Sequence, residues 1–110
     1  MESYYSTQHL ADFRKIVDGS PELGRRFFEY YGKVFADGAL TAREKSLIAL
    51  AVAHTVQCPY CIDQYTQDCQ QKGADFEQMT EALHVAVAIR GGATLVHGMQ
   101  MREQAMKLGM

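Results

Sequence analysis

The stretch TAREKSLIALAVAHTV, residues 41–56, decides the fold. Its first four residues have the spacing of a capping box, with Thr41 as the N-cap and Glu44 as the residue whose side chain returns the hydrogen bond. The helix that follows is apolar on nearly all sides, and its longest apolar run is LIALAVA at 47–53. In a soluble protein such a helix is buried in the centre of a domain or in an interface between subunits. We therefore expect it to form the centre of the fold.

Helical spacing of apolar residues continues on both sides of this central helix. Each predicted helix begins at a capping residue or proline, or ends at a glycine. The helices are expected between Thr7 and Gly19, from Pro21 (after the N-cap Ser20) to residues 36–38, from Thr41 through residue 56, from Pro59 to Lys72, from Asp75 to RGG at 90–92, and roughly from Thr94 to Met106. No Asn-Gly or Asp-Gly turn lies between alternating apolar runs. The sequence predicts one all-α domain of about six helices over residues 1–110.

Composition and charge exclude several classes of protein. The formal net charge is −2 and no block of like charges occurs, so nothing predicts binding to nucleic acid or to an anionic membrane. The run at 47–53 is far shorter than the roughly 20 residues that cross a bilayer. The N-terminal MESYYSTQHL lacks the features of an export signal. We expect a cytoplasmic protein that does not enter the membrane.

The apolar content also predicts self-association. A short chain has limited ability to cover a central helix that is apolar on all sides. The segment FFEYYGKVF at 27–35 adds more large side chains than a small monomer needs. We therefore expect a homo-oligomer, the alternative being that these aromatic residues fill the core of a monomer.

The segment VQCPYCIDQY, residues 56–65, holds two thiols three residues apart. Pro59 predicts a new helix with Cys58 as its N-cap, where unpaired backbone N–H groups and the helix dipole favour a thiolate. A thiolate attacks peroxides, and a second thiol within reach captures the sulfenic acid that results. A structural zinc site needs four ligands, and the histidines show no ligand spacing. Redox chemistry is therefore favoured over a metal site or two inert packed thiols, and no cofactor is expected.

Three other residues, Tyr65, His54 and Glu44, are candidates for the same site, and Cys69 is not. Tyr65 lies one helical turn after Cys61 and on the same face, so its hydroxyl could bond a thiolate or a bound peroxide. His54 and Glu44 lie on one side of the central helix, and Cys58 falls on the same side if the helical spacing is continued to it. Each has a structural interpretation as well: Tyr65 and His54 as core residues, and Glu44 as part of the capping box. Cys69 lies about 12 Å along the helix from Cys61, too far for a direct disulfide, and is expected to be a small buried side chain.

Two segments, REKSLIALAVAHTVQCPYCIDQYT (43–66) and GADFEQMTEALHVAVAIRGGATLVHG (73–98), resemble the carboxymuconolactone decarboxylase-like superfamily. More narrowly, they resemble its alkylhydroperoxidase-D-like branch, which carries Cys-x-x-Cys. The whole chain is similar to the arsenosugar biosynthesis-associated peroxidase-like proteins.

This resemblance implies an all-helical fold, assembly into trimers or hexamers, and dithiol peroxidase or disulfide reductase activity without a prosthetic group. It also implies that Cys61 attacks the peroxide substrate, that Cys58 resolves the sulfenic acid, and that an external dithiol protein reduces the disulfide. Two positions depart from the family. Ser46 stands where the family places a relay glutamate, and Tyr65 where it places a relay histidine. Glu44 lies about 160° around the helix from Ser46 and cannot take its place directly.

The departures leave several interpretations open. One interpretation is that Tyr65, His54 or Glu44 forms a different proton relay. The other is that peroxidase turnover is weak and thiol–disulfide exchange is the main activity. A different class of function is a non-catalytic accessory protein that serves an arsenosugar-synthesising enzyme. The close pair of thiols also suits trivalent arsenic, so arsenite binding is a further alternative. Nothing in the sequence indicates the substrate site of a decarboxylase.

Overall fold

The computed structural model describes residue 8 and residues 12–110, and this part of the chain is helical with no strand. A 3-10 helix, η1 (Phe13–Val17), is followed by four α-helices: α2 (Pro21–Phe35), α3 (Ala42–Thr55), α4 (Pro59–Gln71) and α5 (Phe76–Lys107). The all-α class is confirmed. The helix expected between Thr7 and Gly19 lies partly outside the described residues, and its described portion is η1.

Local capping interactions fix where the central helices begin and end. At the start of α3, the Thr41 hydroxyl accepts a hydrogen bond from the Glu44 backbone N–H at 3.1 Å, and the Glu44 carboxylate accepts from the Thr41 N–H at 2.9 Å. Asp75 and Gln78 make the equivalent reciprocal pair at the start of α5. Gly73, with a φ of 84°, follows α4 and permits the left-handed turn there. These are the helix-start and helix-stop signals that the sequence predicts.

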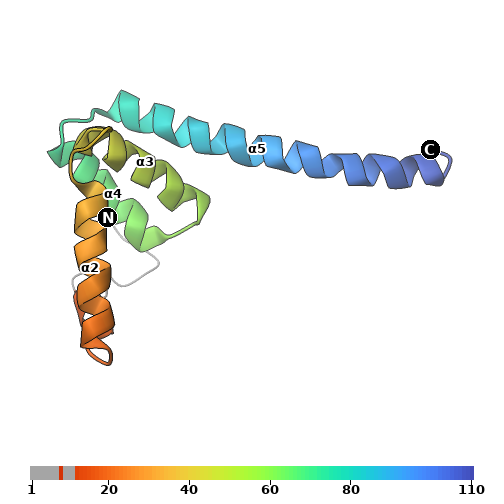
Figure 1. Ribbon diagram of the computed structural model, residues 1–110. Helices are drawn as coiled ribbons and strands as arrows, with labels where there is room; N and C mark the ends of the chain where they lie inside the picture. The colour runs from red at the N-terminus through yellow and green to blue at the C-terminus, as the bar shows by residue number, and fades with distance from the viewer. Residues whose placement is uncertain (1–7, 9–11) are drawn as a thin grey trace.

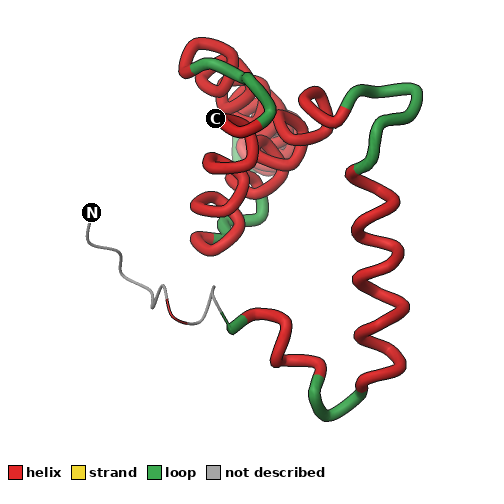
Figure 2. The backbone as a smooth tube through the Cα atoms, turned by 90° about the vertical axis from the view of Figure 1, so that its left-hand side faces the viewer, coloured by secondary structure: helices red, strands yellow, loops and turns green. Residues whose placement is uncertain are grey.

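Helix α3 is the structural centre of the molecule. Helices α4 and α5 pack against it, whereas α2 touches it only weakly and points away from the body (Figures 1 and 2). A small core lies between α3 and α4 and holds the buried residues Leu50, Tyr65, Cys69 and Ala74. Tyr31 and Phe35, from the end of α2, pack against this core. The core therefore joins the end of α2 to α3 and to the second half of α4.

The prediction of about six helices is wrong at the RGG segment. Residues 90–92 do not end a helix, because α5 continues unbroken from Phe76 to Lys107. Each glycine in a helix costs about 1 kcal/mol relative to alanine but removes no backbone hydrogen bond. The strong N-terminal cap and the long flanking helical sequence outweigh that cost. The two helices predicted here are one helix of 32 residues.

The second half of α5 extends far from the rest of the molecule, and we call residues 91–110 the arm (Figure 1). The molecule measures 58 × 36 × 35 Å, and its radius of gyration is 18.8 Å. A compact chain of this length has a radius of gyration of about 13 Å. The accessible surface is 8631 Å², compared with about 6100 Å² for a compact monomer of this mass. One copy of the chain therefore exposes far more surface than a compact monomer does.

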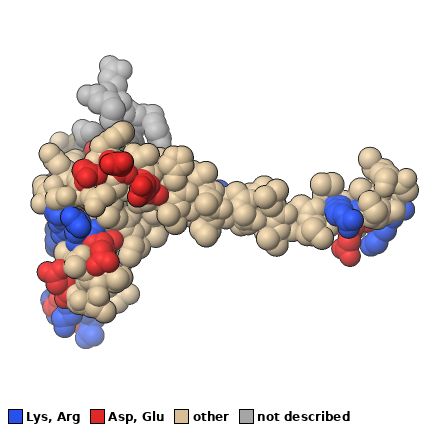
Figure 3. Space-filling view, turned by 90° about the horizontal axis from the view of Figure 1, so that it is seen from above, with Lys and Arg blue, Asp and Glu red and all other residues tan. Residues whose placement is uncertain are grey.

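Much of this additional surface is apolar. Val87 and Ile89, which the helical spacing places on a buried face, are 56% and 67% exposed. On the arm, Leu95 and Val96 are 78% and 71% exposed. The space-filling view shows charged side chains only near the end of the arm, with a long uncharged stretch before them (Figure 3). Among the described residues, no helix combines the length and the apolar character that crossing a membrane requires.

Candidate active site at the start of helix α4

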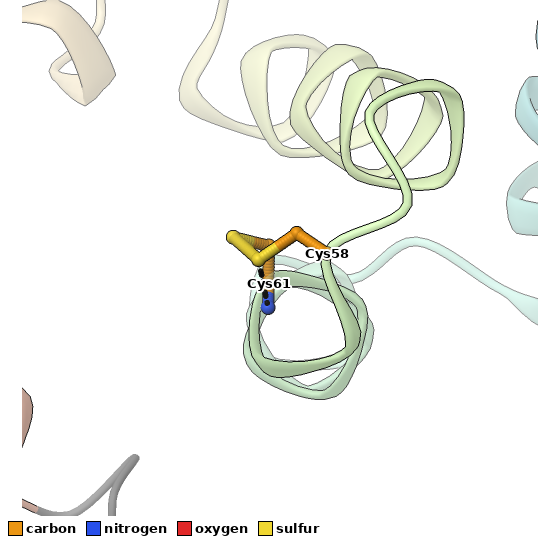
Figure 4. Close-up of a disulfide and its surroundings, with 2 residues drawn as sticks. All are labelled: Cys58 and Cys61. Atoms are coloured by element: carbon orange, nitrogen blue, oxygen red, sulfur yellow. Dashed lines mark hydrogen bonds between the residues drawn. A yellow bond between two sulfur atoms is a disulfide. The ribbon is translucent and has the colours of Figure 1, made fainter. Parts of the chain in front are cut away.

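The cysteine pair lies at the first turn of α4. Cys58 is the N-cap residue and Pro59 the first helical residue, and the Cys58 sulfur accepts a hydrogen bond from the Cys61 backbone N–H at 3.3 Å. The two sulfur atoms are joined as a disulfide, with Cα atoms 5.2 Å apart (Figure 4). Both residues are partly exposed. The sequence prediction of the helix start is confirmed, and the two thiols are placed where they can open and close a bond.

The turn before Cys58 is held by long-range and local contacts. The Cys58 backbone N–H donates to the Ala53 carbonyl at 3.1 Å. Gln57, between α3 and Cys58, has a φ of 58°, a left-handed conformation that residues other than glycine adopt at a cost of about 1 kcal/mol. From α5, the Arg90 guanidinium donates to the Thr55 carbonyl at the end of α3. Arg90 thus ties α5 to the turn that presents Cys58, a role that its position in RGG did not indicate.

Two cavities flank the cysteine pair. One, of about 800 Å³, lies between η1, α2 and α4 and is lined by Ile16, Phe27, Tyr31, Cys58, Tyr60, Cys61 and Tyr65 among others. The other, of about 520 Å³, lies between α2 and α3, and its lining includes Val34, Leu40, Ile48, Val52, Val56 and Cys61. We call this second cavity the α2–α3 groove. Tyr31, Cys61 and Tyr65 line both cavities, so Cys61 lies at their junction.

Tyr65 is the most unusual residue of the site. Its ring stacks on Phe35 with centroids 5.4 Å apart and planes 19° apart, and the side chain is only 8% exposed. Its hydroxyl is buried and has no hydrogen-bond partner among the residues that the structure describes. Leaving a buried donor unpaired costs about 1–3 kcal/mol. The hydroxyl is therefore free to bond a group that enters the site beside Cys61.

Tyr31 is a second hydroxyl of the site, and sequence reasoning missed it. It reaches both cavities from α2, and its ring lies 4.9 Å from that of Phe35. Burial, and then the negative charge of Asp68, raise the pKa of Tyr31 above its ordinary value. It therefore stays protonated at neutral pH. Only the packing of α2 against α4 brings it to the cysteines, so no spacing in the sequence signals it.

The other two candidates, His54 and Glu44, have partners within or next to α3. The His54 Nδ1 atom lies 2.9 Å from the Leu50 carbonyl. Because a carbonyl only accepts, Nδ1 carries the proton and a neutral ring leaves Nε2 as an acceptor. Glu44 is occupied by the capping box with Thr41. Neither residue is among those that line the two cavities.

The capping role of Glu44 gives a pH-dependent expectation. The backbone N–H and then the hydroxyl of Thr41 hold the pKa of Glu44 below its ordinary value of 4.5. Stability from the ionised carboxylate is therefore present above that value and is lost as the pH falls through the lowered pKa. Glutamine at this position can still accept the hydrogen bond but carries no charge. We expect Glu44→Gln to lower the free energy of unfolding near neutral pH, and the difference to shrink as the pH falls below 4.5. Urea unfolding between pH 7 and pH 3 measures this, and a constant difference would contradict it.

The third cysteine lies in the core and away from the pair. Cys69 is fully buried, as is Ser46 on the facing side of α3, and no disulfide involves Cys69. Burial raises the pKa of the Cys69 thiol, and a hydrogen bond with Ser46 opposes this only in part. A buried neutral thiol is a poor nucleophile. The described residues contain no group of three or more histidine, cysteine or acidic side chains that could hold a metal ion.

Comparisons with known proteins agree with this architecture. Residues 21–104 match the model of the carboxymuconolactone decarboxylase family. A Methanobacterium thermoautotrophicum protein is 28% identical with a TM-score of 0.74, over 78% of this chain and 97% of that one. A carboxymuconolactone decarboxylase family protein of Legionella pneumophila is 38% identical with a TM-score of 0.66, over 83% and 79% of the two chains.

Two further relatives complete the comparison. A Thermotoga maritima member of the family, whose description suggests a part in an antioxidative response, is 24% identical with a TM-score of 0.61, over 91% and 94% of the chains. An uncharacterized protein of the Paracoccus denitrificans cox locus is 52% identical over 64 residues. That match spans 58% of this chain and 58% of the relative.

Proposed function

Because the chain belongs to the carboxymuconolactone decarboxylase family and carries a cysteine pair at a helix start beside two apolar cavities, we propose that it is a thiol-dependent peroxidase or disulfide oxidoreductase. The observation that carries this proposal is the position of Cys61 at the junction of the two cavities, with its sulfur bonded to that of Cys58. The Thermotoga relative's suggested antioxidative role is compatible with it, although that likeness supports only the fold.

In the proposed reaction, the Cys61 thiolate of the reduced protein attacks one oxygen of a hydroperoxide. The O–O bond breaks, Cys61 becomes a sulfenic acid, and the alkoxide leaves and takes a proton to become an alcohol. The Cys58 thiol then attacks the Cys61 sulfur, which forms the disulfide and releases water. The two thiols lose two electrons and the peroxide gains them. An external dithiol protein, itself oxidised to a disulfide, restores both thiols.

The site supports different roles for the surrounding residues. The unpaired Tyr65 hydroxyl is our candidate for donating a hydrogen bond to the peroxide oxygen that leaves. The aromatic and aliphatic lining of the cavities favours hydroperoxides with an apolar organic group. A part for His54 or Glu44 in proton transfer stays a prediction, since both side chains already have partners at α3.

Several broader expectations also stay predictions. They are a single domain over residues 1–110, a cytoplasmic location, a trimeric or hexameric assembly, and a link to arsenosugar biosynthesis. The large apolar surface of one copy supports the expectation of self-association. Arsenite binding by the reduced thiol pair is the alternative of a different class, and binding that is unchanged in Cys58→Ser would remove it.

The proposed function is tested by adding one equivalent of cumene hydroperoxide to the fully reduced protein. We expect two thiols to be lost for each peroxide consumed, and peptide mass spectrometry to find a bond between Cys58 and Cys61 with Cys69 still free. Hydrogen peroxide serves as the comparison, and we expect slower oxidation because it gains nothing from the apolar cavities. Thiols that stay free after peroxide is supplied would show that this chain is not a peroxidase.

A further inference from the structure

Two apolar surfaces are left uncovered by the residues that the structure describes in one copy. The first is the arm, where Leu95, Val96 and Met101 are 78%, 71% and 67% exposed. The second is the α2–α3 groove, where Ile48, Val52 and Val56 are 49%, 52% and 64% exposed. The arm points away from the body, so it cannot reach the groove of its own chain (Figure 1).

The composition of the arm indicates that protein, not water, surrounds it. No Lys, Arg, Asp or Glu occurs between Arg90 and Arg102, a stretch of eleven residues that makes about three helical turns. Gly91, Gly92 and Gly98 have no neighbouring atoms at the positions where a Cβ would lie. Each costs about 1 kcal/mol relative to alanine in an exposed helix. Small residues on a helix allow another segment to approach closely, and burial of the apolar side chains would offset this cost.

The area available is sufficient for a stable interface. One copy exposes about 2,500 Å² more than a compact monomer of the same mass. A standard protein interface buries only about 1,600 Å² in total, from both partners together. A second copy of this chain carries both surfaces, so its arm can cover the groove of the first copy and its groove can receive the arm of the first copy. The uncharged part of the arm, residues 91–101, also suits a groove whose lining is apolar except for Lys45.

We propose that the arm of one copy lies in the α2–α3 groove of a second copy and closes the cavity beside Cys61. The cysteine site of one chain is then completed by the other chain, which shields the inner side of Cys61 from water while the larger cavity keeps its own opening. This inference does not rest on the proposed function, because it concerns assembly and is tested without any assay of activity.

The first test changes one surface at a time in the full-length chain. Leu95→Asp places a charge on the arm, and Ile48→Asp places one in the groove. We expect each variant to be monomeric by light scattering at a concentration where the native chain is associated. The matched control is Leu23→Asp on α2, which is 69% exposed and lines neither cavity, and we expect it to associate like the native chain. Circular dichroism confirms that each variant remains helical.

Mixing the two monomeric variants gives the sharper test. The Ile48→Asp chain keeps its arm, and the Leu95→Asp chain keeps its groove, so together they retain one complete contact. We expect the mixture to form a heterodimer of twice the 12.3 kDa chain mass, visible by native mass spectrometry, although neither variant associates alone. Should either aspartate variant fail to fold, Leu95→Gln and Ile48→Gln make the same comparison with a smaller change.

The outcomes separate the possible occupants of these surfaces. If Leu95→Asp is monomeric but Ile48→Asp still associates, the arms pack against each other and the proposal is wrong. A native chain that is monomeric at all accessible concentrations also overturns it, as does a mixture that forms no heterodimer. If the peroxide assay fails, the conclusion about assembly still holds, because light scattering and native mass spectrometry do not depend on activity.

Discussion

Replacing Cys61 by serine is expected to reduce hydroperoxide consumption by at least about a thousandfold, because a serine hydroxyl is a weak nucleophile without an adjacent base. Cys58→Ser is expected to behave differently. Its Cys61 thiolate can still attack one equivalent of peroxide, but no second thiol is in place to resolve the sulfenic acid. The variant should therefore show one rapid turnover and then stop. Stopped-flow measurement of peroxide loss, with dimedone to trap a sulfenic acid on Cys61, distinguishes the two variants.

Cys69→Ala is the matched control for these cysteine changes. Cys69 is buried in the core and is not bonded to either reactive cysteine, so we expect its rate of peroxide consumption to stay within about twofold of the native rate while its stability falls. A single rapid turnover in Cys61→Ser rather than in Cys58→Ser would reverse the assignment of the two sulfurs. That assignment comes from the family resemblance, since the position of the pair at the helix start does not distinguish attack by one sulfur from attack by the other.

Replacing Tyr65 by phenylalanine is expected to change stability and activity in opposite directions. The substitution keeps the ring that stacks on Phe35 and removes only a buried hydroxyl that has no partner in the described part of the chain. The free energy of unfolding should rise by about 1 kcal/mol, because an unsatisfied buried donor is lost. If the hydroxyl donates to the leaving oxygen, the second-order rate constant for hydroperoxide oxidation should fall by about a hundredfold. Urea unfolding of the oxidised protein and stopped-flow oxidation of the reduced protein measure the two effects.

Tyr30→Phe is the control for this change, because Tyr30 lies on α2 and is 66% exposed. We expect neither stability nor rate to change measurably there. A lower stability of Tyr65→Phe would mean that its hydroxyl has a partner such as an ordered water. An unchanged rate would mean that the hydroxyl takes no part in the reaction, and Tyr31→Phe would then be the next variant to measure.

The parts of the fold that local chemistry determines could be predicted from the sequence. Three helix starts depend only on residues within one turn of each other, and all three are present. They are the capping box of Thr41 and Glu44, the N-cap Asp75, and the start at Cys58 and Pro59. Gly91 and Gly92 were misleading, because a local helix penalty does not end a helix whose flanking turns are favourable. Periodicity marks apolar faces but not which molecule covers them, so the exposure of Val87 and Ile89 could not be read from it.

The candidate site was predictable to a similar extent. Tyr65 was expected on the face of Cys61 because the two are four residues apart, and both line the same cavities. The unpaired state of its hydroxyl depends on the packing of Phe35 and Leu50 around it, which no spacing reveals. Tyr31 and Arg90 come from helices distant in sequence. Their contributions follow from the way in which α2 and α5 meet α3, and this is a tertiary property.

Because Cys69 is buried, the rate at which its thiol is labelled measures how often the centre of the molecule opens. A thiol reagent can reach this sulfur only when α4 separates from α3, because the side chain is fully enclosed between them. In Cys58→Ser/Cys61→Ser, every labelling event therefore records one opening of that interface, and its rate under native conditions gives the free energy of local opening. The labelling rate of Cys69 can also be measured in this double variant when it carries Leu95→Asp, which removes the proposed arm contact. A faster rate would show that the neighbouring subunit slows the opening of the interface between α3 and α4.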